Sequence, residues 1–219
     1  QENPCGLYEH TFEYEVDQNA PEVFLNFEGV DSCFYVWLNG AYVGYSQVSH
    51  STSEFDVTSY VKSGENTMRV LVLKWCDGSY LEDQDKFRMS GIFRDVYLLK
   101  RPQRHIWDYR ITTHVEVAAA AVDVHCLLAG GDLPIYARIE NAEGQVVAEG
   151  SLRSLANKGQ KSGLAESGKE QEMSLDNLAM QYKAQVQFCI ENPVFWNTEN
   201  PYLYTLILET EQETIVDRI

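Results

Sequence analysis

The chain of 219 residues is long enough for one large domain or for two ordinary ones. Its formal net charge is −16, with 33 acidic residues against 17 Lys and Arg, so it repels phosphate backbones and nucleic-acid binding is not expected. A hydrophobic fraction of 44% fits a globular protein, and an aromatic fraction of 12%, which includes 13 Tyr, favours β structure.

The cysteine pattern argues against a zinc site or a dense disulfide framework, because the number is odd and no C-x-x-C pair occurs. No run of 18 or more apolar residues is present, so no membrane span is predicted. A signal peptide is not recognisable and the chain opens at Gln1, so the sequence predicts no compartment. We expect buried free thiols at Cys5, Cys33, Cys76, Cys126 and Cys189.

The first half of the chain alternates apolar and polar residues with a period of two, which is typical of half-buried strands. Residues 34–38 are apolar throughout and predict a strand covered on both faces, followed by a tight hairpin turn at Asn39-Gly40. We expect a helical turn capped by Thr58 at residues 56–61 and a plain turn at residues 64–66. The predicted strands are 12–16, 23–28, 34–38, 41–43, 68–74 and 92–99.

The second half begins after residues 101–104, which predict a linker because Pro102 ends a strand and its neighbours are polar. Short strands spaced as in an immunoglobulin-like sandwich follow. Residues 151–171 are rich in Ser, Gly, Lys and Glu, which predicts a loop that is either disordered or functional. The expected strands are 106–115, 121–128, 133–140, 145–149, 183–190, 202–209 and 213–217.

Helical periodicity is missing from the whole chain, since no apolar stripe at helical spacing persists over ten residues. This excludes α/β folds, and in particular a (β/α)₈ barrel, which needs about 250 residues of alternating strands and helices. We therefore predict an all-β chain with two domains, residues 1–102 and residues 103–219.

The segment WCDGSYLEDQD at residues 75–85 places four carboxylates close together beside two aromatic residues. Carboxylates accept paired hydrogen bonds from sugar hydroxyls, aromatic rings stack on pyranose faces, and the same oxygens are hard ligands for a cation. The alternative is a solvated loop whose Asp side chains bind local backbone N–H groups. An independent hydrolytic centre is not expected, because a solvated turn does not separate the pKa values of two carboxyl groups.

The evidence for any other metal-binding, catalytic or phosphate-binding motif is weak. His114 and His125 are eleven residues apart, and no His spacing matches a metal site, so they are interpreted as surface or core residues. Ser90-Gly91 lacks the G-x-S-x-G setting of a nucleophile elbow, and no Gly-rich phosphate loop is present.

Several motifs of the first half resemble the jelly-roll sugar-binding domain of glycoside hydrolase family 2. They are FYVWLNG at residues 34–40, VGYS at 43–46, EFDVT at 54–58 and GEN at 64–66. This family includes β-galactosidases, β-glucuronidases and β-mannosidases. WCDGSYLEDQD at 75–85 and RMSGIFRDV at 88–96 look like the β-galactosidase version, because the other two classes do not share the Asp-Gln-Asp turn.

The resemblance covers nearly the whole chain, with residues 151–171 matching least. NPVFW at 192–196 and ENPYLY at 199–204 are similar to the closing strands of the family's first immunoglobulin-like domain. Asn3-Pro4, with Gly6 and Tyr8, resembles the family's Asn-Pro loop. The chain departs from the family at Phe87, where Trp is frequent, and at Cys76, where Ser is frequent.

Two site residues follow from this resemblance. The last Asp of the Asp-Gln-Asp turn contacts galactose and a sodium ion in the family, which implies both roles for Asp85. The Asn of the Asn-Pro loop reaches the galactose, which implies substrate binding by Asn3. The family's magnesium ion is held by barrel residues, so sodium and magnesium are expected in a parent enzyme and no cofactor in this chain alone.

The resemblance also implies what this chain lacks. The leading jelly-roll strands are expected before Gln1, and the catalytic (β/α)₈ barrel with its acid/base and nucleophile Glu after Ile219. No residue of this chain is therefore predicted to be catalytic.

The implied role is the non-catalytic N-terminal part of a retaining β-galactosidase that hydrolyses terminal β-D-galactosides. Its compartment, bacterial cytoplasm or periplasm, stays unknown. Its expected partners are a β-galactoside, the catalytic barrel of the parent chain and further copies of that chain; no membrane partner is expected. Two alternatives stay open, a free-standing lectin-like module and an assembly domain whose 151–171 loop reaches a neighbouring subunit.

Overall fold

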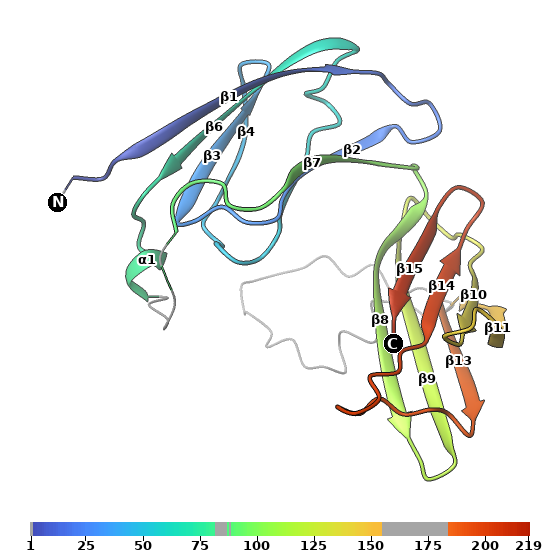
Figure 1. Cartoon of the computed structure of the whole chain (residues 1–219). Coiled ribbons are helices and arrows are strands. Elements are labelled where there is room, and N and C mark those ends of the chain that lie inside the picture. Colours follow the sequence, from blue (N-terminus) through green and yellow to red (C-terminus); the bar gives the residue numbers. More distant parts are fainter. Residues whose placement is uncertain (1, 82–86, 88, 155–183) are drawn as a thin grey trace, which may run out of the picture. The chain divides into compact units, whose positions relative to one another are not determined.

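The computed structural model describes residues 2–81, 87, 89–154 and 184–219 (Figure 1). In this part of the chain every extended element is an antiparallel strand, and one short helix is present, so the all-β prediction is confirmed. The chain divides into two compact units, Gln1–Gln103 and Arg104–Ile219, which are described separately below.

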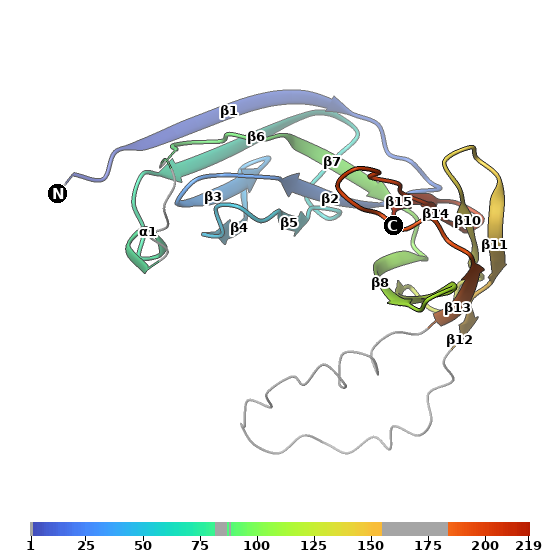
Figure 2. The ribbon, with the colours of Figure 1, turned by 60° about the horizontal axis from the view of Figure 1, so that its bottom comes forward.

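Unit 1 is a sandwich of two antiparallel sheets whose apolar faces meet (Figure 2). The larger sheet has the order β1-β6-β3-β4 and the smaller one the order β5-β2-β7. A single helical turn, α1 (Gly78–Leu81), follows β6. The strands are β1 (Cys5–Tyr14), β2 (Glu22–Phe27), β3 (Cys33–Leu38), β4 (Ala41–Ser46), β5 (Ser53–Asp56), β6 (Gly64–Leu73) and β7 (Val96–Arg101).

The core of unit 1 is built around three phenylalanine rings. Phe27 and Phe34 have ring centroids 4.8 Å apart, and Phe55 meets both edge-on. On β3 the inward residues are fully buried, but Tyr35 and Trp37 on the other face are only half-buried. The prediction that β3 is covered on both faces is therefore wrong, because these aromatic rings pack against one another on the outer face of the sheet.

The hairpin turn after β3 is confirmed: Asn39 and Gly40 have φ angles of 52° and 82°. The turn at 56–61 is present, but its cap differs from the prediction. The N–H of Thr58 donates to the Asp56 carboxylate, and the Thr58 hydroxyl accepts a hydrogen bond from the N–H of Val23. Asp56 therefore caps this turn. Its carboxylate accepts from the backbone N–H two residues further on, which is the geometry of an Asx turn.

The predicted plain turn at 64–66 is wrong, since β6 begins at Gly64. The Asn66 side chain is fully buried and holds the preceding loop. Its Oδ1 accepts from the N–H of Lys62 and from Asn39 Nδ2, and its Nδ2 donates to the carbonyls of Lys62 and Gly64. A buried polar side chain with four partners replaces the hydrogen bonds that water would otherwise supply.

Strand boundaries also differ from the predictions, most clearly at β1 and β7. β1 starts at Cys5, seven positions before the predicted start, because it pairs with β6 without interruption from Cys5↔Leu73 to Tyr14↔Gly64. β7 starts at Val96, because residues 92–95 instead bind residues 28–30 through an isolated bridge and backbone hydrogen bonds.

Unit 2 is a second sandwich, with sheets β12-β13-β9-β8 and β11-β10-β14-β15 around their own core. The predicted linker shortens to residues 102–104, because Arg101 still pairs in β7. β10 starts later than predicted because Pro134 lacks an N–H for the ladder. The strands are β8 (His105–Val115), β9 (Ala119–Ala129), β10 (Tyr136–Glu140), β11 (Val146–Ser151), β12 (Arg153–Ser154), β13 (Ala184–Glu191), β14 (Thr205–Glu209) and β15 (Thr214–Arg218).

The remaining expectations have mixed outcomes. The predicted loop 151–171 begins within β11 and β12, and the rest of it lies outside the described residues. Cys33 and Cys126 are buried thiols, but Cys5 and Cys189 are exposed, so the expectation of burial is wrong for these two. Among the described residues no helix is long and apolar enough to cross a membrane.

Asn66→Ala tests the buried hydrogen-bond hub. It leaves two backbone carbonyls and one backbone N–H of the loop without their side-chain partner, so we expect a loss of about 2–4 kcal/mol in the free energy of unfolding. Urea denaturation followed by tryptophan fluorescence measures this loss. Asn19→Ala, at an exposed turn, is the control and should change stability by less than about 0.5 kcal/mol; equal stability of the two variants would contradict the role of Asn66.

Candidate functional site

The candidate site lies at the end of the larger sheet of unit 1 where β1 begins and β6 ends. Figures 1 and 2 show this start of β1 and α1 at the same end of the sheet. Beyond the last ladder pair, Cys5↔Leu73, the two segments stay joined, because the N–H of Lys74 donates to the Pro4 carbonyl over 3.0 Å. The Asn-Pro loop is thus fixed beside the root of the acidic segment.

Asn3, a predicted sugar ligand, extends this pairing with its side chain. Its Oδ1 accepts from the N–H of Trp75 over 3.0 Å, and its Nδ2 donates to the carbonyl of Trp75 over 2.9 Å. The side chain therefore pairs with Trp75 as a strand backbone would. An amide has two acceptor lone pairs and two N–H donors, so each atom keeps capacity for one further bond, and the residue is exposed.

The acidic segment is only partly described. Asp77, its first carboxylate, accepts from the N–H of Gly78, and the Asp77 carbonyl accepts from the N–H groups of Tyr80 and Leu81. Asp77 therefore shapes α1, as the solvated-loop interpretation expected for such residues. The predicted sugar and sodium ligand Asp85 lies outside the described residues, as do Glu82, Asp83 and Gln84, so its roles stay predictions.

The chain after the acidic turn is also tied to unit 1. The Lys74 ammonium donates to the Ser90 hydroxyl over 2.7 Å, and the Gly91 carbonyl accepts from the N–H of Asp31. Gly91 has a φ of 79°, and a Cβ there would lie 2.3 Å from the Tyr8 hydroxyl, so only glycine fits without displacement. Both ends of the acidic turn are therefore anchored, one through Trp75 and the other through Ser90 and Gly91.

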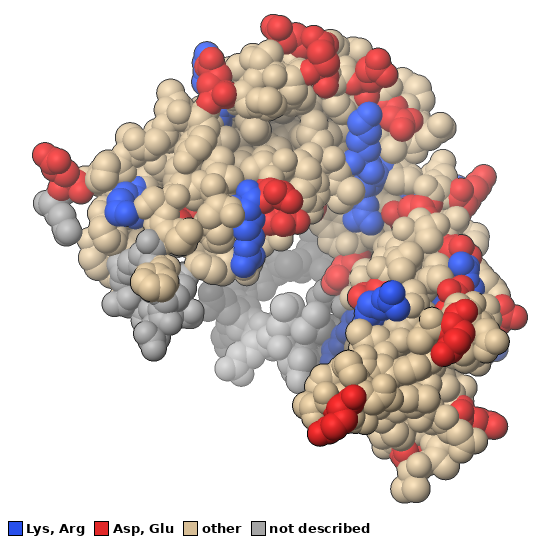
Figure 3. Space-filling view, viewed as in Figure 1, with Lys and Arg blue, Asp and Glu red and all other residues tan. Residues whose placement is uncertain are grey.

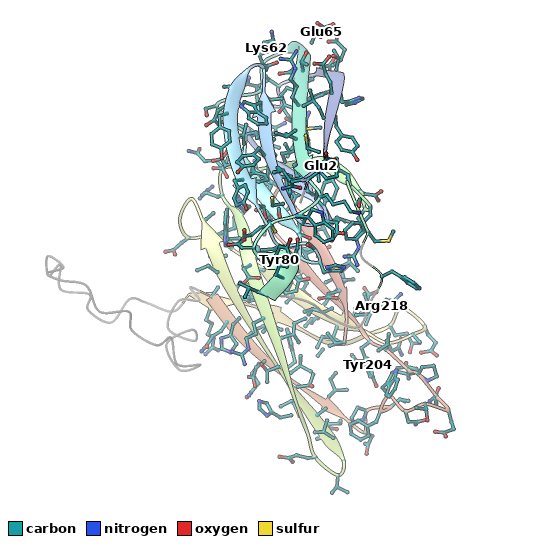
Figure 4. The ribbon with its side chains drawn as sticks, turned by 90° about the vertical axis from the view of Figure 1, so that its left-hand side faces the viewer. Glu2, Lys62, Glu65, Tyr80, Tyr204 and Arg218 are labelled. Atoms are coloured by element: carbon teal, nitrogen blue, oxygen red, sulfur yellow. The ribbon has the colours of Figure 1, made fainter. Side chains whose placement is uncertain are left out.

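Two aromatic rings, those of Trp75 and Tyr80, lie on the N-terminal side of the acidic turn in the sequence. Trp75 and Tyr80 are stacked with centroids 6.2 Å apart and an angle of 27° between their planes, and the Lys74 ammonium lies 5.6 Å from the Trp75 ring. Tyr80 is 63% exposed and lies at the end of unit 1 opposite Lys62 and Glu65 (Figure 4). Phe87, on the far side of the acidic turn, is 94% exposed. Such rings can contact the apolar faces of a sugar.

At the start of α1 the side chains of Cys76, Ser79 and Ser32 form a small polar group that the sequence patterns did not indicate. The Ser79 hydroxyl accepts from the N–H of Cys76 over 3.1 Å, lies 3.7 Å from the Cys76 sulfur, and donates to Ser32 over 3.3 Å. Burial acts to raise the pKa of Cys76, but its interactions with the side chains of Ser32 and Ser79 and with the backbone of Ser79 and Gly78 outweigh it and lower that pKa. Ser32 has a φ of 64°, an unusual backbone conformation for a residue other than glycine.

Among the residues that the structure describes, the histidines and the surface charges indicate no other site. His114 Nε2 lies 3.3 Å from the Asp123 carboxylate on the neighbouring strand, as expected of a surface residue, and His125 lies on β9. Within the described ranges no group of three or more His, Cys, Asp and Glu could hold a metal ion. On the face drawn in Figure 3, Asp and Glu and the fewer Lys and Arg are spread over the surface, with other residues between them.

Comparison with protein families identifies both units. The family described as "Glycosyl hydrolases family 2, sugar binding domain" matches residues 1–102, and "Glycosyl hydrolases family 2" matches residues 104–219. The chain belongs to glycosyl hydrolase family 2. Unit 1 is thus the family's jelly-roll sugar-binding domain and unit 2 its immunoglobulin-like domain, which confirms the predicted fold class.

Curated relatives agree with this assignment. The chain is 41% identical to "Beta-galactosidase" of Staphylococcus xylosus over 221 residues, and 41% identical to "Beta-galactosidase" of Actinobacillus pleuropneumoniae over 220 residues. Each alignment covers 100% of this chain and 19% of the relative. The chain is therefore homologous to β-galactosidases over its whole length and spans about a fifth of theirs.

Solved structures support the fold of this family 2 chain. A β-glucuronidase of Bifidobacterium dentium matches 100% of this chain and 40% of its own, with a TM-score of 0.76 and 19% sequence identity. A β-glucuronidase of an uncultured Clostridium matches 97% of this chain and 34% of its own, with a TM-score of 0.73 and 22% identity. At these identities the likeness shows the fold.

Asn3→Ala tests whether the side-chain pairing with Trp75 holds the root of the acidic segment. Without it the Trp75 N–H loses its acceptor, so we expect its hydrogen-exchange protection to fall about tenfold, which is about 1.4 kcal/mol. Exchange followed residue by residue by NMR measures this. Asn3→Asp keeps the acceptor and should retain most of the protection, while the N–H of Val70 in mid-β6 is the internal control. Unchanged protection of Trp75 in Asn3→Ala would refute this role.

Proposed function

We propose that this chain is the non-catalytic N-terminal part of a retaining β-galactosidase that hydrolyses terminal β-D-galactosides, and that unit 1 contributes one wall of the galactose site. Membership of family 2 and the 41% identity to two β-galactosidases over the whole chain support this proposal. The acid/base and nucleophile carboxylates then belong to a catalytic barrel outside these 219 residues.

The observation that carries the proposal is the pairing of Asn3 with the backbone of Trp75. It brings one predicted sugar ligand to the root of the turn that carries the other, Asp85. A short amide and a short carboxylate have few rotamers, so they form directional hydrogen bonds to ring hydroxyls at a low cost in side-chain entropy. Their role is to bind and orient the galactosyl ring.

We assign the two proposed ions to different parts of the enzyme, sodium to the acidic turn and magnesium to the catalytic barrel. A carboxylate oxygen of Asp85 would be one hard ligand of a sodium ion beside the sugar, and the remaining ligands would come from outside the described residues. Magnesium would be bound by the barrel. A bound cation beside the galactose would neutralise part of the negative charge that the acidic turn concentrates there.

Asp85→Ala in the full-length enzyme tests the proposed contact. Loss of a charge-assisted hydrogen bond should lower kcat/KM for a β-galactoside by at least about 2 kcal/mol, which is about 30-fold. Asn3→Ala should act in the same direction. The matched control is Glu65→Ala, an exposed carboxylate at the opposite end of unit 1, which should leave kcat/KM unchanged (Figure 4). An unchanged kcat/KM in Asp85→Ala would remove this residue from the galactose site.

Calorimetry distinguishes this function from a free-standing lectin. Titration of the 219-residue chain with galactose should show no binding tighter than about millimolar, because two polar residues and one aromatic pair leave most of a sugar solvated. Tighter binding would favour the lectin-like module over a wall of a larger site.

A further inference from the structure

The hairpin turn between β3 and β4 carries the only Asn-Gly pair of the chain, Asn39-Gly40. Asn is a thermolabile residue, and a following glycine leaves the next peptide nitrogen most accessible to its side chain, because glycine has no Cβ. Both residues are exposed, and apart from the chain neighbours nothing lies within 4 Å of the position that a Cβ of Gly40 would take. Burial therefore does not protect this pair from water.

The Asn39 side chain is nevertheless held by three hydrogen bonds. Its Nδ2 donates to the carbonyl of Tyr60 over 2.9 Å and to Oδ1 of Asn66 over 2.8 Å, and its Oδ1 accepts from the N–H of Thr67 over 3.0 Å. The backbone N–H of Asn39 donates to the Thr67 carbonyl over 2.8 Å as well. Both N–H groups of the amide are therefore bonded, and its oxygen has a donor, all from partners 21 to 28 positions further along the chain.

These partners admit one orientation of the amide. A carbonyl oxygen can only accept and a backbone N–H can only donate, so Nδ2 has to face Tyr60 and Oδ1 has to face Thr67. The Asn66 amide cannot turn round either, because its Nδ2 donates to two carbonyls and its Oδ1 also accepts from a backbone N–H. Closing a ring onto the Gly40 nitrogen requires the Asn39 side chain to rotate, which breaks all three of its hydrogen bonds.

We propose that Asn39-Gly40 is a latent deamidation site, which the native hairpin keeps intact and which reacts once the hydrogen bonds to Tyr60, Asn66 and Thr67 open. The Gly40 nitrogen loses its proton and bonds to Cγ of Asn39, the Cγ–Nδ2 bond breaks, and the amide nitrogen takes up the proton and leaves as ammonia. Water then opens the succinimide at either carbonyl and gives Asp or isoaspartate. Water is consumed and ammonia released, and nothing is oxidised or reduced.

The fold accepts neither product. A carboxylate at residue 39 has no N–H to donate, so its oxygen would face the Tyr60 carbonyl and Oδ1 of Asn66, which are themselves acceptors. Isoaspartate adds a backbone carbon to a turn whose flanking residues, Leu38 and Ala41, pair directly with each other. Deamidation therefore makes the opening of this hairpin irreversible. This proposal does not depend on the galactosidase function.

Peptide mapping of the full-length protein tests the proposal without any substitution. The protein is kept at mildly alkaline pH with or without denaturing guanidinium, cleaved after Glu and analysed by mass spectrometry. Asn39 is the only Asn of peptide 29–54, and Asn26 of peptide 23–28, which precedes the bulky Phe27, is the internal control. We expect Asn39 to deamidate before Asn26 in guanidinium, and at least about tenfold more slowly in the native protein. Equal rates at Asn39 in both samples would overturn the proposal.

Two variants separate the hydrogen bonds of Asn39 from the stability of unit 1 as a whole. Asn66→Ala removes one acceptor of Asn39 Nδ2, whereas Val70→Ala opens a cavity in the core on the same strand and leaves all partners of Asn39 in place. Without denaturant we expect deamidation at Asn39 to rise at least about tenfold in Asn66→Ala and less than about threefold in Val70→Ala. Equal acceleration in both variants would contradict protection by these bonds. The comparison of native with unfolded protein stands even if Asn66→Ala fails to fold.

Asn39→Asp tests whether the fold accepts the product side chain. We expect its unfolding equilibrium constant, measured by denaturation, to rise at least about tenfold, because two acceptors lose their donor. Gln18→Glu makes the same change from amide to carboxylate at an exposed bend and should alter this constant by less than about threefold. A stability of Asn39→Asp equal to that of the unsubstituted protein would overturn the irreversibility.

Discussion

The pairing of β1 with β6 is the constraint on which the rest of unit 1 depends. The ladder runs without a register shift from Tyr14↔Gly64 to Cys5↔Leu73. It then continues beyond both strands, first through the Pro4 carbonyl and finally through the Asn3 side chain, which takes the place of a backbone partner for Trp75. A side chain is needed at this point because the chain after Trp75 leaves the plane of the sheet to form α1.

This extension holds Trp75, which precedes the acidic turn in the sequence, and a separate set of bonds holds residues 90–95, which follow it. Residues 91–95 run beside residues 28–31 and exchange backbone hydrogen bonds with them. The Lys74 ammonium links the two anchors, since it bonds to the Ser90 hydroxyl and lies near the Trp75 ring.

The sequence predicted the elements whose signals are local. Alternation located most strands, and Asn39-Gly40 specified its own turn because both residues tolerate positive φ. What the sequence missed depends on partners far along the chain. β1 extends to Cys5 only because β6 offers ten ladder positions. Asn66 organises the preceding loop through its side chain, although the tripeptide Gly-Glu-Asn reads as an ordinary turn in the sequence.

The candidate site also combines a residue that the sequence indicated with contacts that it did not. The resemblance to family 2 selected Asn3, but no local pattern indicates that its amide pairs with Trp75, 72 residues away.

The two departures from the family pattern follow from this architecture. At residue 76 the backbone N–H, rather than the side chain, holds the turn by donating to Ser79, so a change from Ser to Cys leaves that hydrogen bond in place. Phe87 is 94% exposed, so a smaller ring than Trp costs little packing within unit 1. Because a backbone group holds the turn at residue 76 and Phe87 is exposed, the side chains at these two positions can vary.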